Sequence, residues 1–267
     1  MIIFNIPVGS RKILRTVKDW LKDAFILSFA SKSNKSAFNF IYFSYAPDFE
    51  YLLLSLKSLV QNTRPIRSIY LFVDQKAPFS EEQCQTLINI YPDLIFKTIN
   101  NFEWASAEST KAEIDAFLDV VKNSLPNDYI VKVDSDILFL NSTKMSRIAA
   151  SGLDAIGDGH WERYKFFQGG LYIIKVNVAE RVFSNFEMDD LKNMIKEKLN
   201  NITAEDRCVT QILRDNNIKL YYTSLMLFPS EYQKLSKFNW FVKWNFSALH
   251  FVRDKDNMAS YYKRLFG

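Results

Sequence analysis

Two aspartates, Asp134 and Asp136, interrupt a run of β-branched and apolar residues between Ile130 and Leu140. The run predicts a buried strand, and ionised carboxylates at the end of such a strand cost free energy unless a cation meets them. Side chains at positions i and i+2 of an extended chain point the same way, so the two carboxylates can converge on one target. Divalent cations prefer oxygen ligands of this kind. We therefore predict a divalent metal site with open positions that suit a phosphate-bearing substrate.

Three further features that can carry chemistry follow along the chain. The run Gln168–Gly170 ends in two glycines, which let backbone approach a ligand closely or adopt positive φ. Glu205 and Asp206 place carboxylates at the start of a predicted helix, and His250 is a lone imidazole in an apolar segment. Each also has a plainer use, because carboxylates favour a helix N-terminus and a lone buried histidine is more often only hydrogen-bonded. The residue types alone leave both uses open.

The elements that must position these residues alternate between strand and helix in the first half of the chain. Apolar runs predict strands, and apolar residues at three- and four-residue spacing predict helices. We expect strands at 38–43, 68–73, 94–99 and 129–133, and helices at 48–61, from 80 onward and 108–122. This alternation predicts βαβ units and a largely parallel sheet, in which ligands bind beyond the carboxyl ends of the strands. Asp74 and Asp134 both follow such an end.

The pattern is looser after residue 140. Apolar spacing still predicts elements there, although the order of strands and helices is less regular. We expect helices at 143–150, 178–186, 191–199 and 205–216, and strands at 154–159, directly after the glycine pair and at 219–223.

Composition favours one large α/β domain with extensions. The 267 residues are 48% hydrophobic and 24% charged, which supports a sizeable core. The net charge of +4 is mild and does not indicate nucleic acid as a partner. No run approaches the roughly 20 apolar residues of a membrane span, no signal-peptide pattern occurs, and two lone cysteines fit a reducing compartment. We therefore expect a cytoplasmic protein.

Both ends of the chain combine basic and apolar residues. Residues 11–29 predict an amphipathic helix that either packs on the core or a neighbouring subunit, or lies on an anionic membrane surface. Residues 234–263 interleave basic with aromatic residues, a pattern that can bind single-stranded nucleic acid and that also suits a membrane interface or a helical lid over the site. We expect peripheral contact with the inner face of a membrane. The chain is divided into a helix and linker at 1–36, a catalytic domain at 37–252 and a basic-aromatic tail at 253–267.

Taken in order, the Asp-x-Asp element, the glycine pair, the acidic pair and the late histidine resemble the GT-A class of nucleotide-sugar glycosyltransferases over about residues 37–252. The resemblance implies an α/β fold with a Rossmann-like, mixed and mainly parallel sheet flanked by helices, with helical and aromatic terminal extensions. It implies that Asp136 and His250 bind Mn²⁺, with Mg²⁺ as the alternative, and that Asp134 has a ribose or water-mediated metal role. A divalent cation would neutralise the diphosphate leaving group without proton transfer.

The resemblance also implies roles for donor and acceptor residues. Asp206, with Glu205 beside it, would be the general base of an inverting transfer, but retaining members use this position less regularly, so the anomeric outcome stays open. From the residues themselves, His160 is either a fallback metal ligand or an acceptor contact. Trp161 is either an acceptor contact, because an aromatic ring can stack on a sugar face, or a core residue. The expected nucleotide-sugar contacts are Ser44, Tyr45, Ala46, Asp74, Lys111, Asp134, Ser135, Gln168, Gly169 and Gly170.

These features predict a metal-dependent glycosyltransferase that moves a sugar from a nucleotide donor, expected to be UDP-linked, to a glycan or lipid-linked glycan. Its expected setting is bacterial capsule, O-antigen or lipopolysaccharide synthesis. The alternative is a catalytically degenerate subunit of a polysaccharide assembly complex that binds nucleotide sugar without turnover. A haloacid-dehalogenase-like phosphatase is disfavoured because three strands precede the Asp-x-Asp element. A nucleotidyltransferase is disfavoured because Ser44–Asp48 lacks a glycine-rich basic loop.

Overall fold

The computed structural model describes residue 21 and residues 36–100, 105–159, 166–252 and 254–267. Its strands are β1 (Phe38–Ser44), β2 (Ile66–Asp74), β3 (Leu94–Ile99), β4 (Tyr129–Val133), β5 (Ile137–Phe139), β6 (Ala155–Gly159), β7 (Phe167–Lys175), β8 (Leu220–Tyr222), β9 (Met226–Leu227) and β10 (Ala248–His250). Its α-helices are α2 (Phe49–Asn62), α3 (Glu81–Ile90), α4 (Ala107–Val121), α5 (Thr143–Ser151), α6 (Val176–Phe183), α7 (Met188–Lys198), α8 (Glu205–Asp215), α9 (Pro229–Leu235), α10 (Asn239–Asn245) and α11 (Met258–Phe266). Short 3₁₀ turns are η1 (Ala46–Asp48), η2 (Ser236–Phe238) and η3 (Lys255–Asn257).

Within these described residues, the main sheet has the strand order β3-β2-β1-β4-β7-β6-β8. Strands β3, β2, β1 and β4 are parallel, whereas β7 runs antiparallel to both β4 and β6. The predicted alternation of strands and helices up to β4 is confirmed, and so is the expected α/β class with a mixed, mainly parallel sheet. The carboxyl ends of β1, β2 and β4 therefore meet at one edge.

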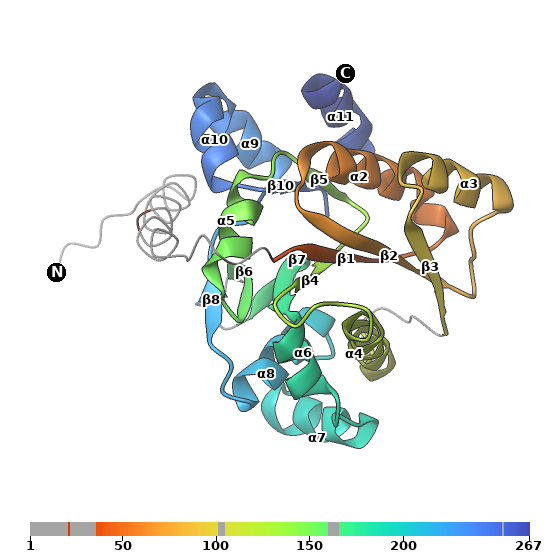
Figure 1. The fold of residues 1–267 in the computed structure, drawn as a ribbon, viewed down its shortest axis with the longest axis vertical. Helices are drawn as coiled ribbons and strands as arrows, with labels where there is room; N and C mark the ends of the chain where they lie inside the picture. The colour runs from red at the N-terminus through yellow and green to blue at the C-terminus, as the bar shows by residue number, and fades with distance from the viewer. Residues whose placement is uncertain (1–20, 22–35, 101–104, 160–165, 253) are drawn as a thin grey trace.

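Helices cover both faces of the main sheet (Figure 1). Along β1, Phe38, Phe40 and Tyr42 pack in one core cluster with the apolar face of α2, while Ile41 belongs to the cluster on the other face with α4, α6, α7 and α8. This alternation follows from the two-residue period of a strand. Because both faces are buried, the central strands are almost continuously apolar, which is why they could be predicted from the sequence.

A small second sheet with the order β5-β10-β9 lies beside the carboxyl edge. The apolar run that begins with β4 does not continue as one strand, because the chain turns at residues 134–136 and re-enters as β5. Strand β10 pairs antiparallel with β5, so that His250 lies opposite Ile137. This pairing brings the late histidine next to the two aspartates.

The C-terminal helices pack on this second sheet. A third core cluster joins Leu138 and Leu249 to Val242 of α10 and Met258 and Tyr261 of α11. In the part of the chain that the structure describes, no helix has both the length and the apolar composition needed to cross a bilayer. The predicted helix at 11–29 lies outside the described residues, and the division of the chain at residues 36 and 252 stays a prediction.

Candidate active site at the carboxyl edge of the sheet

Three potential metal ligands meet where β4 ends. Asp134, Asp136 and His250 each offer one ligand atom, and these atoms all lie within 4.8 Å of one another. The Nε2 atom of His250 is 3.4 Å from Oδ1 of Asp136 and 4.0 Å from Oδ2 of Asp134. The turn after β4 supplies the aspartates and β10 supplies the histidine. The structure therefore brings together the three residues that the sequence predicted as metal ligands.

The buried atoms of this group fit a cation. Among the described residues, Oδ1 of Asp136 and both ring nitrogens of His250 have no hydrogen-bond partner, although both side chains are almost fully buried. Burial raises the pKa of Asp136, but His250, Lys255 and Lys132 outweigh that effect and hold this pKa below its ordinary value. Apart from the 3.4 Å contact between these two side chains, their buried ligand atoms are unsatisfied, which is costly. A divalent cation would satisfy both, and Mn²⁺ or Mg²⁺ suits a site rich in carboxylate.

The glycine pair lies against the histidine. A Cβ atom built on Gly170 would be 2.5 Å from Cε1 of His250, and one on Gly169 would be 3.5 Å from Oδ2 of Asp206. Both glycines lie inside strand β7 rather than in a loop before it, and neither has positive φ. Of the two uses considered for the pair, positive φ is therefore not the one observed, and close approach to a ligand stays a prediction. Gly170 leaves room for the imidazole, and Gly169 faces Asp206.

A buried lysine joins the Asp-x-Asp turn to the glycine pair. The Nζ atom of Lys132, on β4, donates to Oδ1 of Asp134 and, at 2.8 Å, to the carbonyl of Gly169. Burial lowers the pKa of Lys132, but the carboxylates of Asp134 and Glu113 outweigh it, so the pKa stays above the ordinary value. Lys132 is therefore a fixed internal cation beside one oxygen of Asp134.

A buried carboxyl group lies near enough to this lysine to interact with it electrostatically. Glu113, on the inward face of α4, is fully buried and accepts a hydrogen bond from the hydroxyl of Tyr172 on β7. Burial raises the pKa of Glu113 to about 8, and this increase prevails although Lys132 opposes it. Glu113 is therefore mostly protonated at neutral pH, which lowers the cost of burying it.

The loop after β1 is tied to the Asp-x-Asp turn. Ser135 Oγ donates to Oδ2 of Asp48 at 3.0 Å, and Lys255 Nζ lies 3.3 Å from Oδ1 of the same carboxylate. Burial lowers the pKa of Lys255, but Asp48 and Asp136 raise it above its ordinary value. A lysine from the C-terminal segment thus lies at the carboxyl edge, close enough to influence Asp136. Its charge is of the right sign for a phosphate-bearing ligand.

The two acids at the start of α8 have different surroundings. Glu205 is buried, and its Oε1 accepts hydrogen bonds from the backbone N–H of Ala105 at 2.9 Å and from Ser109 Oγ at 2.6 Å. These bonds fix the start of α4 against α8. Asp206 lies in the first turn of α8 and faces Gly169. Of the two, Asp206 is the carboxylate directed towards the glycine pair.

Other residues that were predicted to bind the nucleotide-sugar donor are distributed along the carboxyl edge of the main sheet. Ser44 ends β1 with a buried hydroxyl that has no partner in the described ranges, and Tyr45 is 42% exposed. Ala46 opens η1, and its N–H donates to the carbonyl of Ala77. Gln168 lies on β7 directly before the glycine pair. These residues stay predictions as donor contacts.

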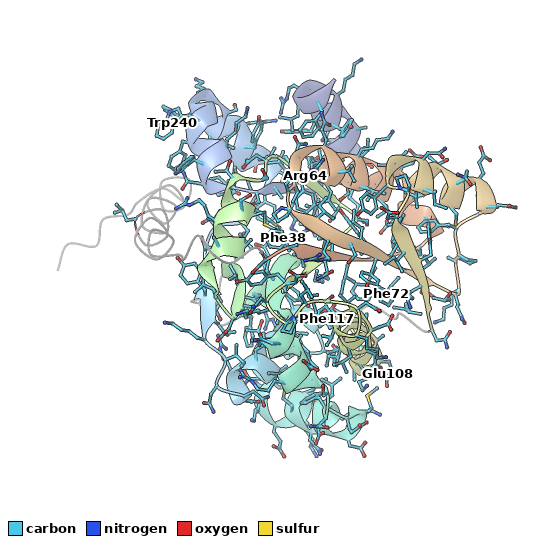
Figure 2. All side chains as sticks on the ribbon, viewed as in Figure 1. Phe38, Arg64, Phe72, Glu108, Phe117 and Trp240 are labelled. Atoms are coloured by element: carbon cyan, nitrogen blue, oxygen red, sulfur yellow. The ribbon has the colours of Figure 1, made fainter. Side chains whose placement is uncertain are left out.

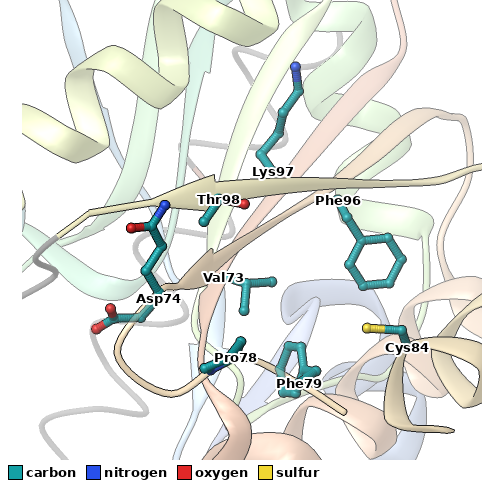
Figure 3. A pocket seen from close by; sticks show the side chains of 9 residues that line it. Val73, Asp74, Pro78, Phe79, Cys84, Phe96, Lys97 and Thr98 are labelled. Carbon is teal, nitrogen blue, oxygen red and sulfur yellow. The ribbon is translucent and has the colours of Figure 1, made fainter. Parts of the chain in front are cut away.

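Two residues that were predicted to bind the nucleotide-sugar donor make other contacts in the structure. Asp74 caps the turn after β2 by accepting from the N–H of Lys76 at 2.9 Å, and it lines a cavity of about 430 Å³ between β2, β3 and α3 (Figure 3). None of the three metal-site residues lines this cavity. Lys111 pairs with Asp115 on α4. Their donor roles also stay predictions, and the expected acceptor residues His160 and Trp161 lie outside the described residues.

Four functional candidates were missed by the sequence reasoning: Asp48, Glu113, Lys132 and Lys255. The signal for Lys132 was present, because a lysine inside an apolar strand needs a carboxylate partner. Glu113 has a similar signal on the apolar face of a predicted helix. Asp48 and Lys255 carry no such pattern, since an acid and a base in polar segments are ordinary surface residues. Only the packing of the C-terminal segment on the core brings them together.

The fold matches solved structures of sugar-transferring enzymes. The galactosyltransferase LgtC, determined with donor and acceptor sugar analogues, has a TM-score of 0.54 and 13% identity over 86% of this chain and 96% of its own. Mouse xyloside xylosyltransferase 1 has a TM-score of 0.51 and 10% identity over 82% of this chain and 98% of its own. The bifunctional glycosyltransferase WbbM has a TM-score of 0.56 and 11% identity over 88% of this chain and 51% of its own.

This chain has the GT-A fold. No protein-family model and no curated protein sequence matches it. The likeness at 10–13% identity establishes the GT-A architecture, and the expected GT-A resemblance is confirmed at the level of fold. The activity of this chain depends on its own residues at the carboxyl edge of the main sheet, because a fold alone does not determine function.

Proposed function

We propose that the protein is a glycosyltransferase that moves a sugar from a nucleotide donor to a hydroxyl of an acceptor with the help of a divalent cation. The observation that carries this proposal is the convergence of Asp134, Asp136 and His250, with buried unpaired ligand atoms, at the carboxyl edge of a GT-A sheet. Ligands of open α/β sheets bind at this edge. The fold and the three potential metal ligands thus support the same reaction class.

Asp136 and His250 would hold the cation, with Oδ2 of Asp134 as the third ligand atom. Mn²⁺ is the proposed ion and Mg²⁺ the alternative. When bound, such an ion offsets the negative charge that develops on the nucleotide diphosphate as the sugar–phosphate bond breaks. Lys132 orients Asp134 by binding its other oxygen, so that the carboxylate keeps one oxygen free.

The donor nucleotide would lie over the loop that follows β1. Ser44, Tyr45 and Ser135 line this region, and Lys255 adds a cation beside Asp48 that suits a diphosphate. Of the glycine pair, Gly169 is partly exposed, whereas Gly170 is buried against His250. We propose a UDP-linked sugar as the donor.

Asp206 is the proposed general base. A transfer to a hydroxyl needs a carboxylate within hydrogen-bond reach of the acceptor oxygen, and Asp206 faces Gly169 from the first turn of α8. In an inverting reaction, Asp206 would accept the acceptor proton as that oxygen attacks the anomeric carbon; the anomeric outcome itself stays open. Glu205 has its Oε1 engaged in two hydrogen bonds to residues 105 and 109, and we assign it to positioning α8 and Asp206.

The proposed acceptor is a glycan or a lipid-linked glycan, as in the assembly of a bacterial surface polysaccharide at the inner face of a membrane. The solved galactosyltransferase with the same fold was determined with both donor and acceptor sugar analogues. That likeness supports a sugar acceptor for this chain. The basic and aromatic C-terminal residues support the lipid-linked form.

A donor screen tests the proposal. Hydrolysis of individual nucleotide sugars is measured with Mn²⁺ and with EDTA, and we expect one donor class to be hydrolysed only with the ion. Asp136→Ala should lower this rate at least about 100-fold, while Asp93→Ala, at an exposed aspartate before β3, should leave it near wild type. Metal-independent hydrolysis that persists in Asp136→Ala would contradict the site. Tight nucleotide binding without turnover of any donor would instead favour the degenerate binding subunit.

A further inference from the structure

Three large aromatic side chains are exposed together near the C-terminus. Phe238, Trp240 and Trp244 are 56%, 71% and 48% exposed, and they lie on η2 and the adjoining helix α10. Figure 2 shows Trp240 at the outer edge of the molecule. Single exposed apolar residues are ordinary, but several together on one short segment mark an interaction surface.

These rings do not lie on the face of the segment that packs on the core. Val242 and Phe246 of the same segment are 1% and 0% exposed and belong to the core cluster with β5 and β10. Helix α10 is therefore already anchored through one face. The exposed aromatic residues form its opposite face, and burying them is not needed to fold the segment.

The surroundings of the aromatic residues are basic. Lys234, Lys237 and Lys243 are all exposed, and no Asp or Glu occurs between residues 232 and 252. We call the six residues Phe238, Trp240, Trp244, Lys234, Lys237 and Lys243 the α10 surface. Arg147 of α5 adds a further cation, with its guanidinium 5.5 Å from the ring centre of Trp244. The occupant of this surface must therefore be both apolar and anionic.

We propose that the α10 surface binds an anionic lipid bilayer. Tryptophan rings settle at the headgroup level, where one part of the ring is in an apolar environment and the other is hydrated. Exposed lysines beside them are attracted to anionic headgroups. A second copy of the chain is a poorer occupant, because a two-fold contact would place this basic surface against itself.

The α10 surface is linked to the candidate active site along the chain. Helix α10 leads directly into β10, which carries His250. Phe228, at the start of α9, stacks on the His250 ring with a centroid distance of 5.9 Å. The following step rests on the proposed glycosyltransferase function. A bilayer bound to this surface would hold the site near the headgroups, where a lipid-linked acceptor presents its sugar.

Vesicle flotation of the full chain, without donor or metal, tests the proposal. We expect binding to phosphatidylcholine vesicles that contain about one third phosphatidylglycerol, and little binding to phosphatidylcholine alone. The triple change Lys234→Gln, Lys237→Gln and Lys243→Gln should weaken the partition coefficient on the order of 100-fold, at roughly five-fold per lysine. The change Phe238→Ser, Trp240→Ser and Trp244→Ser should reduce the bound fraction to under about a tenth.

Matched variants control for general effects on surface polarity. Leu125→Ser and Ile202→Ser remove apolar side chains that are exposed elsewhere, and Lys122→Gln and Lys192→Gln remove exposed lysines. These variants should float like wild type. Quenching by brominated lipid gives a second readout, because Trp240→Phe with Trp244→Phe should still bind but should lose the quenched part of the fluorescence.

The outcomes separate the proposals. Equal binding to neutral and anionic vesicles, unchanged flotation of the lysine and aromatic variants, or a dimer that the aromatic variants dissociate would each overturn the lipid-binding role. Hydrolysis of the donor by the same preparations is measured separately and does not depend on vesicles. Loss of flotation with normal donor hydrolysis therefore affects only the α10 surface, and the reverse result affects only the proposed reaction.

Discussion

Gly170 and His250 are in direct contact across two different sheets of the GT-A fold. A Cβ atom on Gly170 would lie 2.5 Å from Cε1 and 2.7 Å from Nδ1 of His250. Such a distance is far inside van der Waals contact, so any side chain at position 170 would displace the imidazole. The glycine is therefore part of what sets the position of the metal ligand.

Gly170→Ala should displace His250 and weaken Mn²⁺ binding at least about tenfold. Gly169→Ala is the matched control, because its Cβ would lie 3.5 Å from Asp206 in ordinary contact. Titration of Mn²⁺ followed by electron paramagnetic resonance measures both. Equal Mn²⁺ affinity in the two variants would show that the imidazole is not a ligand.

Asp206→Asn should lower kcat by about 10²–10⁴-fold while leaving nucleotide affinity near wild type, because only the proton acceptor is lost. Glu205→Gln should retain most activity, since its amide oxygen can still accept from the N–H of Ala105 and the hydroxyl of Ser109. Transfer kinetics and calorimetric nucleotide binding distinguish the two. Near-normal transfer by Asp206→Asn would remove the base assignment.

Lys132→Met should tighten Mn²⁺ binding a few-fold and at the same time slow transfer. The ammonium binds Asp134 at the oxygen that does not face His250, so its removal makes the ligand group more negative. The change also removes the hydrogen bond from Lys132 to the carbonyl of Gly169, so β7 and the Asp-x-Asp turn are no longer connected through this side chain. Lys122→Met, which removes an exposed cation at the C-terminal end of α4, is the control. Weaker Mn²⁺ binding in Lys132→Met would indicate a structural role alone.

The buried carboxyl of Glu113 predicts a pH dependence of stability. Burial raises its pKa in the folded state to about 8, above its ordinary value of 4.5. The folded protein thus keeps this proton longer than the unfolded chain, so the stability present below about pH 4.5 is lost as pH rises towards 8. The slope is at most about 1.4 kcal/mol per pH unit.

Glu113→Gln removes this titration and keeps an oxygen for the Tyr172 hydroxyl. Its free energy of unfolding relative to wild type should therefore increase by about 2 kcal/mol between pH 6 and pH 8. Urea unfolding with EDTA present measures the difference, and Glu108→Gln on the exposed face of the same helix controls for loss of a carboxylate. A difference that stays constant with pH would contradict a neutral Glu113.

The parts of the fold that the sequence predicts are those with strong local patterns. Strands β1, β2 and β4 are apolar runs that are largely buried, and β3 is a shorter run at the edge of the sheet. Ser80 with Gln83 forms the capping box that opens α3. Strands β5, β9 and β10 were missed because each has only two or three residues, and pairing between distant segments defines them. Local sequence carries no information on such pairing.

The candidate site divides in the same way. Asp134 and Asp136 were predicted from residue type and spacing, and His250 from the resemblance to the GT-A class; the structure brings the three together. The contact of Lys255 with Asp48 depends on how the C-terminal segment packs on α2, which no spacing in the sequence indicates. The α10 surface shows a similar limit. The sequence shows that the segment is rich in basic and aromatic residues, but it does not show which of the aromatic rings are exposed.

The most direct test of the central claim is the affinity of UDP for wild type and Asp136→Asn, measured by calorimetry with Mn²⁺ and with EDTA. A divalent cation held by Asp136 and His250 should make UDP binding to wild type at least about tenfold tighter with Mn²⁺. The variant should bind UDP with the same weak affinity in both conditions. UDP affinity that is independent of Mn²⁺ in wild type, or a full Mn²⁺ effect in Asp136→Asn, would contradict the proposed metal-dependent donor site.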